Sequence, residues 1–570
     1  MSSRLSPAAM SLAEMLTRFH KYTIPDYQRV YAWGEDQVKL LLSELEKATS
    51  GKAVEDKVWL YLGTIYLAVP AGSQEAEIAD GQQRILTATM LYAAGRDLAE
   101  DPAEAERLHA ILLAPGANAD TPLFRFVPRD LDAGFFRQWV QEKGATLRAH
   151  PLDGPSEEAE GLPGTEAMFS ESRRHIIANR DTIVARLRLL GGNGRRRLFE
   201  AMEVSTETVA ITAPTLEEAR NAYASTQTRG LRQAETDKLK AELIGDCPRS
   251  LRARLAGRWE ESEAILGQDN LAELLQHMIV VRAERKAQHA LEVDLFSAFD
   301  LPKEAERYIE GELVPSAQAY KRICAAGKTG SGREGRINGH LATLLRTTHD
   351  GWKAPALLAL RQLGDDPAKL ERFLRDLERL AAVMMIAGVD PNDMIQRYVA
   401  VIRQIKAGRA GAADALHPSG AELNRARDCL LETRFAQRDR FRMPLLLKLN
   451  DLFAKTVQAI DPRMVSCEHI LPRNLPKGSP WRELFYDAQR KRYEGASFVH
   501  TLGNLAILTH QDNRCANTLP FPEKRAILKR SDFPLTRDAA KVKIWSPQAV
   551  TERTERLAGM LIGHWHLQGN

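Results

Sequence analysis

The chain has 570 residues, of which 44% are hydrophobic and 27% charged, a composition typical of folded globular proteins and incompatible with disorder throughout. This length exceeds what one hydrophobic core usually organises, so we expect two to four domains. The net charge of +4 is too small to indicate nucleic-acid binding by itself. Any such surface must come from local clustering of charge.

Cysteine spacing and apolar runs indicate the compartment. The five cysteines form no C-x-x-C pair, which excludes a four-thiolate zinc site and a disulfide framework and favours a reducing environment. No apolar run approaches 18 residues, and the N-terminus lacks a charged start followed by an apolar stretch. We therefore expect a cytoplasmic protein that does not span a membrane.

The first hundred residues combine strand and helix patterns. Residues 11–19 and 36–48 have helical periodicity, and residues 58–69 are aromatic and β-branched enough for a buried strand. A turn and a short strand over 77–79 then lead into a helix predicted over 85–98. This order predicts a small α/β domain.

Residues 100–440 are almost entirely helical in pattern, and the last 110 residues differ in composition, with Trp, His, Asn and Pro concentrated there. Clusters of Gly, Pro and Ser interrupt the helices at 151–166, 190–197, 325–339 and 408–420. We predict three domains, at residues 1–245, 246–439 and 440–570.

Five polar residues stand between the predicted strand and the helix that follows it. Gly81 permits a tight turn, and the unpaired amides at the helix start favour an anion. Arg84 suits phosphate oxygens, and Asp80 suits a magnesium ion or an attacking water. Gln82 and Gln83 can each donate and accept hydrogen bonds to ribose, a base edge or water. The alternative is a solvated helix start with Asp80 as N-cap.

A second polar segment, residues 22–37, precedes the first long helix. It combines a helix-stopping proline, a Gln-Arg pair and three aromatic residues: Pro25, Tyr27, Gln28, Arg29, Tyr31 and Trp33. So much aromatic surface is costly in a loop unless it lines a pocket. The two Gln-Arg pairs, each next to a turn, predict a two-sided polar cradle.

Four segments in order, "IPDYQRVYAW", "LGTIYL", "DGQQRILT" and "STQTRGLRQAETDKLK", resemble the GmrSD-type N-terminal domain. That domain is similar to the ParB and sulfiredoxin fold and hydrolyses nucleoside triphosphates. The resemblance implies a nucleotide site of Gln28, Arg29, Asp80, Gly81, Gln82, Gln83 and Arg84, with Asp80 and Arg84 catalytic. It implies sensing of DNA or its modification by Tyr27, Tyr31 and Trp33.

The fourth segment departs from the family in part. Tyr223 and Gln227 stand where the family has phenylalanine and asparagine, and Gln227 places its amide about one methylene further out than asparagine would. Four residues match the pattern: Arg229, Gly230, Asp237 and Lys240.

The last third of the chain holds a second constellation, "CEHILPRNLP" followed by "LGNLAILTHQDNRCAN". An acid-His-x-x-Pro sequence followed by two asparagines nine residues apart resembles the ββα-metal, or HNH, nucleases. His469 suits a general base, and the oxygens of Glu468 and Asn513 suit magnesium. Asn504 would tie the loop together and keep the histidine aimed. The alternative is a structural histidine with turn-forming asparagines.

The nuclease resemblance also implies DNA contacts by Asn517 and Lys524, which fall on the helix after the motif and would face the phosphate. The last 45 or so residues are rich in Lys and Arg, which favours contact with phosphates. Because only Cys467 and Cys515 lie nearby, we predict no structural zinc in this domain.

Both ends of the chain resemble, in order, single-chain GmrSD-like type IV restriction enzymes of the SspE and BrxU kind. This implies a mostly α multidomain protein with a small α/β (ParB/sulfiredoxin-like) N-terminal domain and a C-terminal ββα-metal HNH nuclease domain. The implied function is an NTP-hydrolysing DNA endonuclease of bacterial defence that nicks or cuts modified or phage double-stranded DNA. It would use Mg²⁺ or another divalent cation and GTP, ATP or UTP, with a possible homo-oligomer.

Two alternatives stay open at this point: a DNA-binding sensor with an inactive nuclease-like domain, and an RNA-cleaving toxin. The modification that is read, whether phosphorothioate, glucosylated hydroxymethylcytosine or another, is not specified by any motif.

Overall fold

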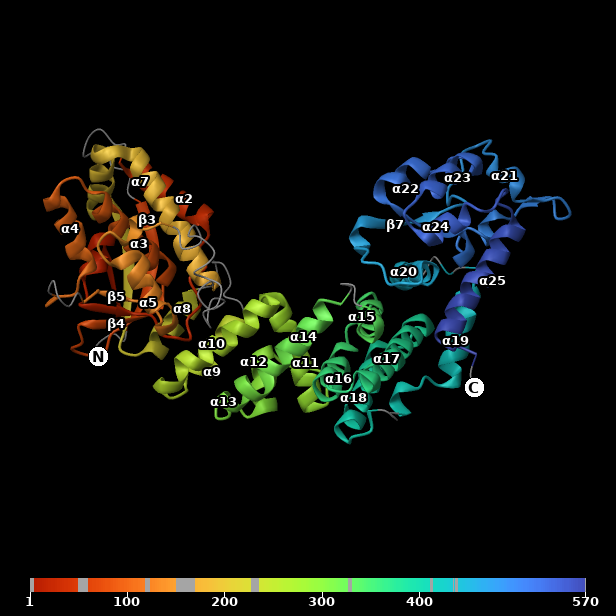
Figure 1. Ribbon diagram of the computed structural model, residues 1–570, viewed down its shortest axis with the longest axis horizontal. Helices are drawn as coiled ribbons and strands as arrows, with labels where there is room; N and C mark the ends of the chain where they lie inside the picture. The colour runs from red at the N-terminus through yellow and green to blue at the C-terminus, as the bar shows by residue number, and fades with distance from the viewer. Residues whose placement is uncertain are drawn as a thin grey trace. The chain divides into compact units, whose positions relative to one another are not determined.

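The structure is a computed structural model that describes residues 5–49, 60–117, 123–149, 170–226, 235–326, 331–410, 414–433, 435 and 439–568. It is mostly helical with one larger sheet, which confirms the predicted mostly α, multidomain architecture (Figure 1). Contacts divide the chain into unit 1, Met1–Ala264 with Pro302–Ile309, and unit 2, Ile265–Leu301 with Glu310–Asn570. The two boundaries between the three predicted domains stay predictions.

Unit 1 contains a six-stranded mixed sheet in the order β1-β6-β3-β4-β2-β5. The strands are β1 Ser6–Met10, β2 Lys21–Thr23, β3 Leu60–Ala68, β4 Glu75–Asp80, β5 Phe126–Val127 and β6 Thr206–Ala213. The central strand β3 runs antiparallel to β4 and parallel to β6. It falls where the buried strand was predicted.

Strand β6 corrects the expectation that residues 100–440 are almost entirely helical. Its sequence TETVAITA is rich in β-branched residues, which pack well on a pleated surface. It pairs with β3 and with β1, partners some 140 and 200 residues earlier in the chain. Pairing over such separations leaves little trace in local periodicity.

The helices of unit 1 include α1 Leu12–Thr17, α2 Glu35–Ala48, α3 Gln82–Leu98, α4 Pro102–Leu112, α5 Asp130–Phe136, α7 Glu171–Val204, α8 Leu216–Thr226, α9 Glu235–Gly245 and α10 Arg249–Leu266. Of these, α1, α2, α7 and α8 contact strands of the sheet directly. Helix α3 is buried over most of its length and packs on α4 and α7. At Gly95 a Cβ atom would collide with the ring of Phe199 on α7. This close approach fixes the C-terminal part of α3 against α7. The break predicted at 190–197 is a kink in α7 at Gly191.

The first part of unit 2 is helical, as predicted: α11 Gln268–Ala283, α12 Leu291–Phe299, α14 Val314–Cys324, α15 Gly332–Leu345, α16 Lys353–Leu363, α17 Pro367–Ala387, α18 Pro391–Lys406 and α19 Gly420–Leu431. Among the described residues, no helix is both long and apolar enough to cross a membrane.

The second part of unit 2 begins with α20, Asp439–Ala454, and is built around an antiparallel ribbon of β7, Val465–His469, and β10, Leu505–Thr509. Helix α22, His510–Ala516, follows β10 directly, so the order is strand, strand, helix. The remaining elements are α21 Trp481–Leu484, β8 Tyr486–Asp487, β9 Arg492–Tyr493, α23 Phe521–Arg530, α24 Pro534–Ala539 and α25 Pro547–His564. One core joins the ribbon to α17, α19, α20 and α25.

Candidate functional site

The β4–α3 junction in unit 1 requires glycine. Gly81 has φ 103°, a left-handed conformation that other residues rarely adopt, and a Cβ there would lie 2.8 Å from Ile65 of β3. The chain therefore turns directly from Asp80, the last residue of β4, into the first turn of α3. This is the strand-to-helix junction that the sequence predicts, although α3 begins three residues earlier than expected.

Three glutamines bring the two predicted motifs together. Gln83 Oε1 accepts hydrogen bonds from the backbone N–H groups of Ala32 and Trp33, and its Nε2 donates to the Val30 carbonyl. Gln82 donates to the Arg29 carbonyl at 2.6 Å. Gln28 in turn donates to the carbonyls of Ile78 and Ala79 in β4. The amides thus fasten residues 28–33 onto the junction.

The Arg84 guanidinium is hydrogen-bonded to strand β3 of the sheet. Its guanidinium donates to the carbonyls of Leu62 and Thr64, at 2.6 and 2.9 Å, across a bulge in β3. Gly63 in that bulge has φ 89°, and a Cβ there would collide with the Arg84 guanidinium. Asp80 lies 3.7 Å from Arg84, and burial raises the pKa of its carboxyl, partly offset by Arg84 and Tyr223. Asp80 is therefore a partly exposed carboxyl beside two donors.

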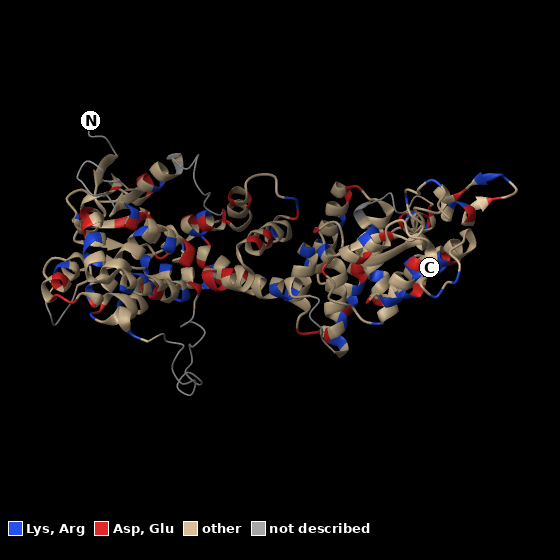
Figure 2. Ribbon diagram, turned by 90° about the horizontal axis from the view of Figure 1, so that it is seen from above, with Lys and Arg blue, Asp and Glu red and all other residues tan. Residues whose placement is uncertain are grey.

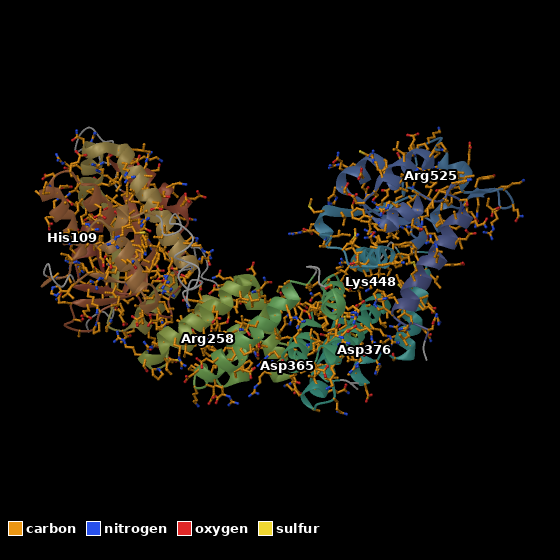
Figure 3. All side chains as sticks on the ribbon, viewed as in Figure 1. His109, Arg258, Asp365, Asp376, Lys448 and Arg525 are labelled. Carbon is orange, nitrogen blue, oxygen red and sulfur yellow. The ribbon has the colours of Figure 1, made fainter. Side chains whose placement is uncertain are left out.

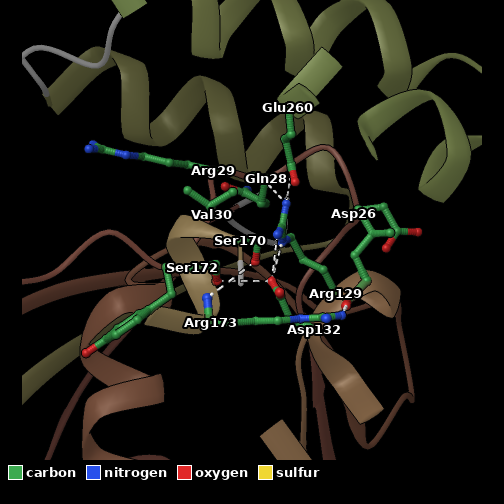
Figure 4. A network of polar contacts seen from close by, with 12 residues as sticks. Asp26, Gln28, Arg29, Val30, Arg129, Asp132, Ser170, Ser172, Arg173 and Glu260 are labelled. Atoms are coloured by element: carbon green, nitrogen blue, oxygen red, sulfur yellow. Dashed lines mark hydrogen bonds and ion pairs between the residues drawn. The ribbon is translucent and has the colours of Figure 1, made fainter. Parts of the chain in front are cut away.

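A buried network of charged side chains contacts the first predicted motif at Gln28 (Figure 4). Glu260 of α10 pairs with Arg129 and with Lys240 of α9, and Arg129 also pairs with Asp132 at 2.6 Å. Arg129 donates to the Gln28 carbonyl as well, so the network reaches the first motif. Sequence reasoning missed Arg129, Asp132 and Glu260. The spacing of Arg129 and Asp132 at the start of α5 is the one local signal that they carry.

The residues matched in the fourth family segment divide between described and undescribed parts. Gln227, Arg229 and Gly230 lie outside the described residues. Lys240 is buried in the network above. Asp237 is also buried, one carboxylate oxygen has no hydrogen-bond partner, and burial raises the pKa of its carboxyl, with Arg29 as the first opposing charge.

The aromatic set is not arranged as a stacking surface. Tyr27 and Tyr31 are 1% and 2% exposed, and Arg220 lies over the Tyr27 ring. The Tyr31 hydroxyl contacts Thr87 of α3 at 2.7 Å and accepts a hydrogen bond from Asn179 of α7. Trp33 is partly buried against the core. The geometry gives Tyr27 and Tyr31 packing roles, and the role of this set in sensing DNA stays a prediction without support from their exposure.

In unit 2, Asn504 sits at the start of β10 with its side chain fully buried. Its Oδ1 accepts from the Leu471 N–H at 2.7 Å and from the Trp545 indole at 3.1 Å, while its Nδ2 donates to the carbonyls of Leu471 and Val499. The two bonds to Leu471 connect the chain after β7 to the residue that precedes β10, and the other two bind Asn504 to Val499 and to Trp545. Asn504 is therefore placed to tie the loop beside His469.

We expect Asn504→Ala to lower the free energy of unfolding by about 2–3 kcal/mol, because it leaves four buried partners without hydrogen bonds. Urea denaturation of the full chain, followed by tryptophan fluorescence, measures this. Asn513→Ala is the matched control: its side-chain Nδ2 donates only to the Ser466 hydroxyl, so the loss should be clearly smaller. Equal losses for the two variants would contradict the tying role.

His469 ends β7 with an imidazole that is 9% exposed. Its Nε2 is buried and has no hydrogen-bond partner, and its ring centroid lies 5.5 Å from that of His500. Burial, followed by the charges of Arg473 and Arg442, lowers the pKa of His469 to about 3. The ring is therefore neutral at pH 7 and has a nitrogen available to accept a proton.

Glu468 and Lys524 form a buried ion pair on the ribbon. Lys524 Nζ contacts Glu468 Oε1 and donates to the carbonyls of His469 and Ile470 at 3.0 and 3.1 Å. Lys524 has no exposed surface, so it does not present its ammonium to DNA in this conformation, contrary to expectation. Its geometry is that of a positioning residue for the end of β7.

The two faces of the ribbon hold different predicted residues. Side chains alternate along a strand, so Ser466 and Glu468 share one face and His469 points to the other. Asn513 of α22 donates to the Ser466 hydroxyl at 2.8 Å, so it belongs to the Glu468 face. One carboxylate and one amide group on a single face fit the hard oxygen donors that Mg²⁺ prefers. Lys524 already neutralises part of that carboxylate's charge.

The other predicted DNA contacts are mixed. Asn517 is exposed just after α22 with φ 30°. Several of the Lys and Arg residues near the C-terminus are instead bound to carbonyl or carboxylate oxygens. Arg525 donates to Ala540, Arg530 pairs with Asp512, and Lys541 pairs with Asp538. Segments coloured for Lys and Arg are also interspersed with those for Asp and Glu along the ribbon (Figure 2). Charge alone therefore does not mark the DNA path.

Two family models match the chain where these sites lie. The "GmrSD restriction endonuclease, N-terminal domain" matches residues 12–244, and the "GmrSD restriction endonucleases, C-terminal domain" matches residues 421–560. Together the matches cover well over half of the chain. The chain belongs to the GmrSD family of restriction endonucleases. A search of curated proteins finds no match.

Membership of the GmrSD family supports a restriction nuclease that acts on DNA. The N-terminal match includes the Gly81 junction and the glutamine contacts, and the C-terminal match includes His469, Asn504 and Asn513. The C-terminal match begins at residue 421, inside α19 and before the predicted boundary at residue 440.

Proposed function

We propose that this GmrSD protein is a metal-dependent DNA endonuclease whose N-terminal domain hydrolyses a nucleoside triphosphate and senses modified DNA. The observation that carries the nuclease part is the buried, unpartnered Nε2 of His469 at the end of the β7–β10 ribbon. An imidazole held neutral, with no partner for one nitrogen, suits a general base that takes a proton from water.

The chain's own residues would divide the work as follows. His469 accepts the proton of the attacking water, Asn504 fixes the loop that follows β7, and Lys524 holds the carbonyls of His469 and Ile470. Glu468 and Asn513 offer oxygen donors for a divalent cation on the face of the ribbon opposite His469. A cation bound there would not reach the phosphate that His469 serves, so in this conformation these two residues do not fit the metal that would stabilise charge on the phosphate and the leaving oxygen.

The proposal of a nucleotide site in the N-terminal domain rests on the β4–α3 junction, onto which the glutamines fasten residues 28–33. Gly81 permits the tight turn from β4 into α3 against Ile65, and the first amides of α3 with Arg29 would favour phosphate oxygens. Asp80 would position the attacking water or a magnesium ion. A small cavity of about 10 Å³ beside Gln82, Arg29 and Arg129 has room for one water molecule at this place.

One experiment separates the candidate functions. Purified full chain with Mg²⁺ is given supercoiled plasmid or structured RNA, and nucleoside triphosphate hydrolysis is measured with unmodified, phosphorothioated or glucosylated DNA. The proposal expects plasmid nicking and a hydrolysis rate that rises with one modified DNA. Hydrolysis without nicking would favour a DNA sensor with an inactive nuclease domain. Cleavage of RNA alone would favour an RNA-cleaving toxin.

Asp80→Asn tests the nucleotide site without changing side-chain size. We expect nucleotide hydrolysis to fall by about 100-fold, because the carboxylate would position water or metal in the transition state. This variant is sharper than Arg84→Ala, which would also free the carbonyls of the β3 bulge. Asp36→Asn, at the start of α2, is the matched control and should hydrolyse at the wild-type rate.

The same pair of variants tests whether the nucleotide controls the nuclease. If nucleotide hydrolysis in unit 1 regulates His469, addition of nucleotide should change the nicking rate of the wild type and of Asp36→Asn, and not that of Asp80→Asn. Nicking rates that are identical with and without nucleotide in all three proteins would contradict the regulation.

A further inference from the structure

A polar cluster in the helical part of unit 2 lies apart from the residues discussed so far. Glu273 and His277 are one turn apart on α11, and Asp350 precedes α16. One ligand atom from each lies within 4.8 Å of the others. Among the described residues, this is the one group of three imidazole, thiol or carboxylate side chains with that spacing.

The decisive feature is the imidazole of His277. Its side chain is 8% exposed, and its Nε2 is buried without a hydrogen-bond partner. The nearest carboxylate oxygen, Glu273 Oε1, lies 3.6 Å away, too far for a hydrogen bond. A buried polar nitrogen left unpaired is unfavourable, so a ligand that used it would recover the lost interaction.

The surroundings favour a cation at this position. Two carboxylates face one ammonium, that of Lys353, which contacts Glu273 Oε1. Two carboxylates and one ammonium give this group a net negative charge. A divalent cation would reverse that sign and use the free imidazole nitrogen.

We propose that Glu273, His277 and Asp350 form a binding site for a divalent transition metal, of which Zn²⁺ fits best. One imidazole nitrogen with two carboxylate oxygens is a zinc-type donor set, whereas Mg²⁺ takes oxygens alone. Ligand atoms around one tetrahedral zinc lie about 3.4 Å apart, so the observed spacing needs only side-chain rotation to close. Water would fill the fourth position, because Asp350 is exposed.

The metal would link helices that already pack together. Helix α11 contacts α14 and α16, and the Tyr320 ring of α14 stacks beside His277 at 6.0 Å between centroids. Glu273 and His277 belong to α11, and Asp350 fixes the entry to α16 by accepting the Lys353 N–H at its backbone carbonyl. Binding in the folded state alone would stabilise this helical region.

The test uses the full chain, dialysed against a chelator and returned to excess Mg²⁺, so that sites built from oxygen ligands are filled. Zn²⁺ is then titrated by isothermal calorimetry, and bound zinc is counted by mass spectrometry after gel filtration. We expect one more zinc per chain in the wild type than in His277→Gln. The matched control His289→Gln removes an exposed imidazole paired with Asp294 in the same unit and should retain that zinc.

Lys353→Met gives a second and opposite expectation. Removal of the competing ammonium should make zinc bind about tenfold more tightly, as changes next to metal ligands commonly alter affinity by that amount. Circular dichroism in chelator shows whether each variant is folded. Equal zinc content in the wild type, Lys353→Met and His277→Gln would overturn the proposal. Since the readout is bound metal, this result is independent of nuclease or nucleotide activity.

Discussion

Replacement of His469 by alanine should reduce the rate of plasmid nicking by about 10²–10⁴-fold, the usual contribution of a general base. The expectation follows from one atom, the unpartnered Nε2 of a neutral imidazole at the end of β7. Nicking is measured as loss of supercoiled plasmid under single-turnover conditions. Nucleotide hydrolysis in unit 1 should be unchanged, and urea denaturation shows whether unit 2, which carries His469, is folded.

His510→Ala is the matched control for this substitution. His510 is the first residue of α22, the helix that follows strand β10 of the ribbon. It is exposed, and its ring contacts only the Arg463 carbonyl. Its replacement should leave nicking at the wild-type rate. Comparable losses in the two variants would contradict the assignment of His469 as the base.

The low pKa of His469 also has a defined consequence for pH dependence. Burial lowers this pKa from 6.5 to about 3, so the imidazole stays unprotonated at all pH values above that. Nicking by the free enzyme should therefore show no loss between pH 7.5 and 6 that comes from this histidine. Because the unfolded chain binds this proton near pH 6.5, the histidine's contribution to stability is lost as the pH falls from about 6.5 toward 3.

Replacement of Glu378 by glutamine should lower the free energy of unfolding of unit 2 by about 3–5 kcal/mol. Glu378 of α17 is 2% exposed and accepts hydrogen bonds from Lys448 at 2.8 Å, His340 at 2.6 Å and the Trp565 indole at 3.0 Å. Lys448, on α20, is labelled in Figure 3. Glutamine would leave the buried Lys448 ammonium without its counter-charge.

A control on the same helix distinguishes burial from charge. Glu371 pairs with Arg333 and Arg336 at the surface, so Glu371→Gln should cost less than about 1 kcal/mol. The double variant Glu378→Leu with Lys448→Met should recover much of the lost stability, because it removes both buried charges together. Urea denaturation measures all three. A double variant as unstable as Glu378→Gln would contradict this account.

Glu378 also contributes to acid sensitivity. Lys448, His340 and His564 hold the pKa of its carboxyl well below 4.5 against the opposing effect of burial. A carboxyl with a depressed folded-state pKa stabilises the protein above its unfolded pKa, and this contribution is lost as the pH falls below about 4.5. Glu378→Gln should therefore flatten the acid limb of the stability curve.

The sequence predicted features that depend on local pattern. Strand β3, the turn at Gly81 and the loop contacts of Asn504 follow from residue types within short windows. The pairing of the two Gln-Arg motifs was also anticipated, but its chemistry differs: the three glutamines bind backbone groups and Arg84 binds the β3 bulge. In the sequence, a glutamine or arginine that binds a ligand looks the same as one that fastens a loop to the backbone.

Other features depend on contacts that no local pattern encodes. Lys524 is one of four basic residues in helix α23, and only its packing against Glu468, 56 residues earlier, shows that it is buried. The Glu378 group draws side chains from four helices, with separations of up to 187 residues. Strand β6 was missed for the same reason, since its partners lie far away in the chain.

The core shared by α17, α19 and the nuclease ribbon determines where this chain can be recombined. Ala382 and Ile386 of α17 and Leu430 of α19 pack in one cluster with Ile507 of β10 and Leu561 of α25. A crossover at residue 440 would separate these partners and expose apolar surface on both products. A fusion or exchange of nuclease modules that preserves folding must therefore carry α19 with the ribbon and bring a matching face for α17. Compatibility of that face, more than of the catalytic residues, would limit which nuclease modules can be exchanged between such proteins.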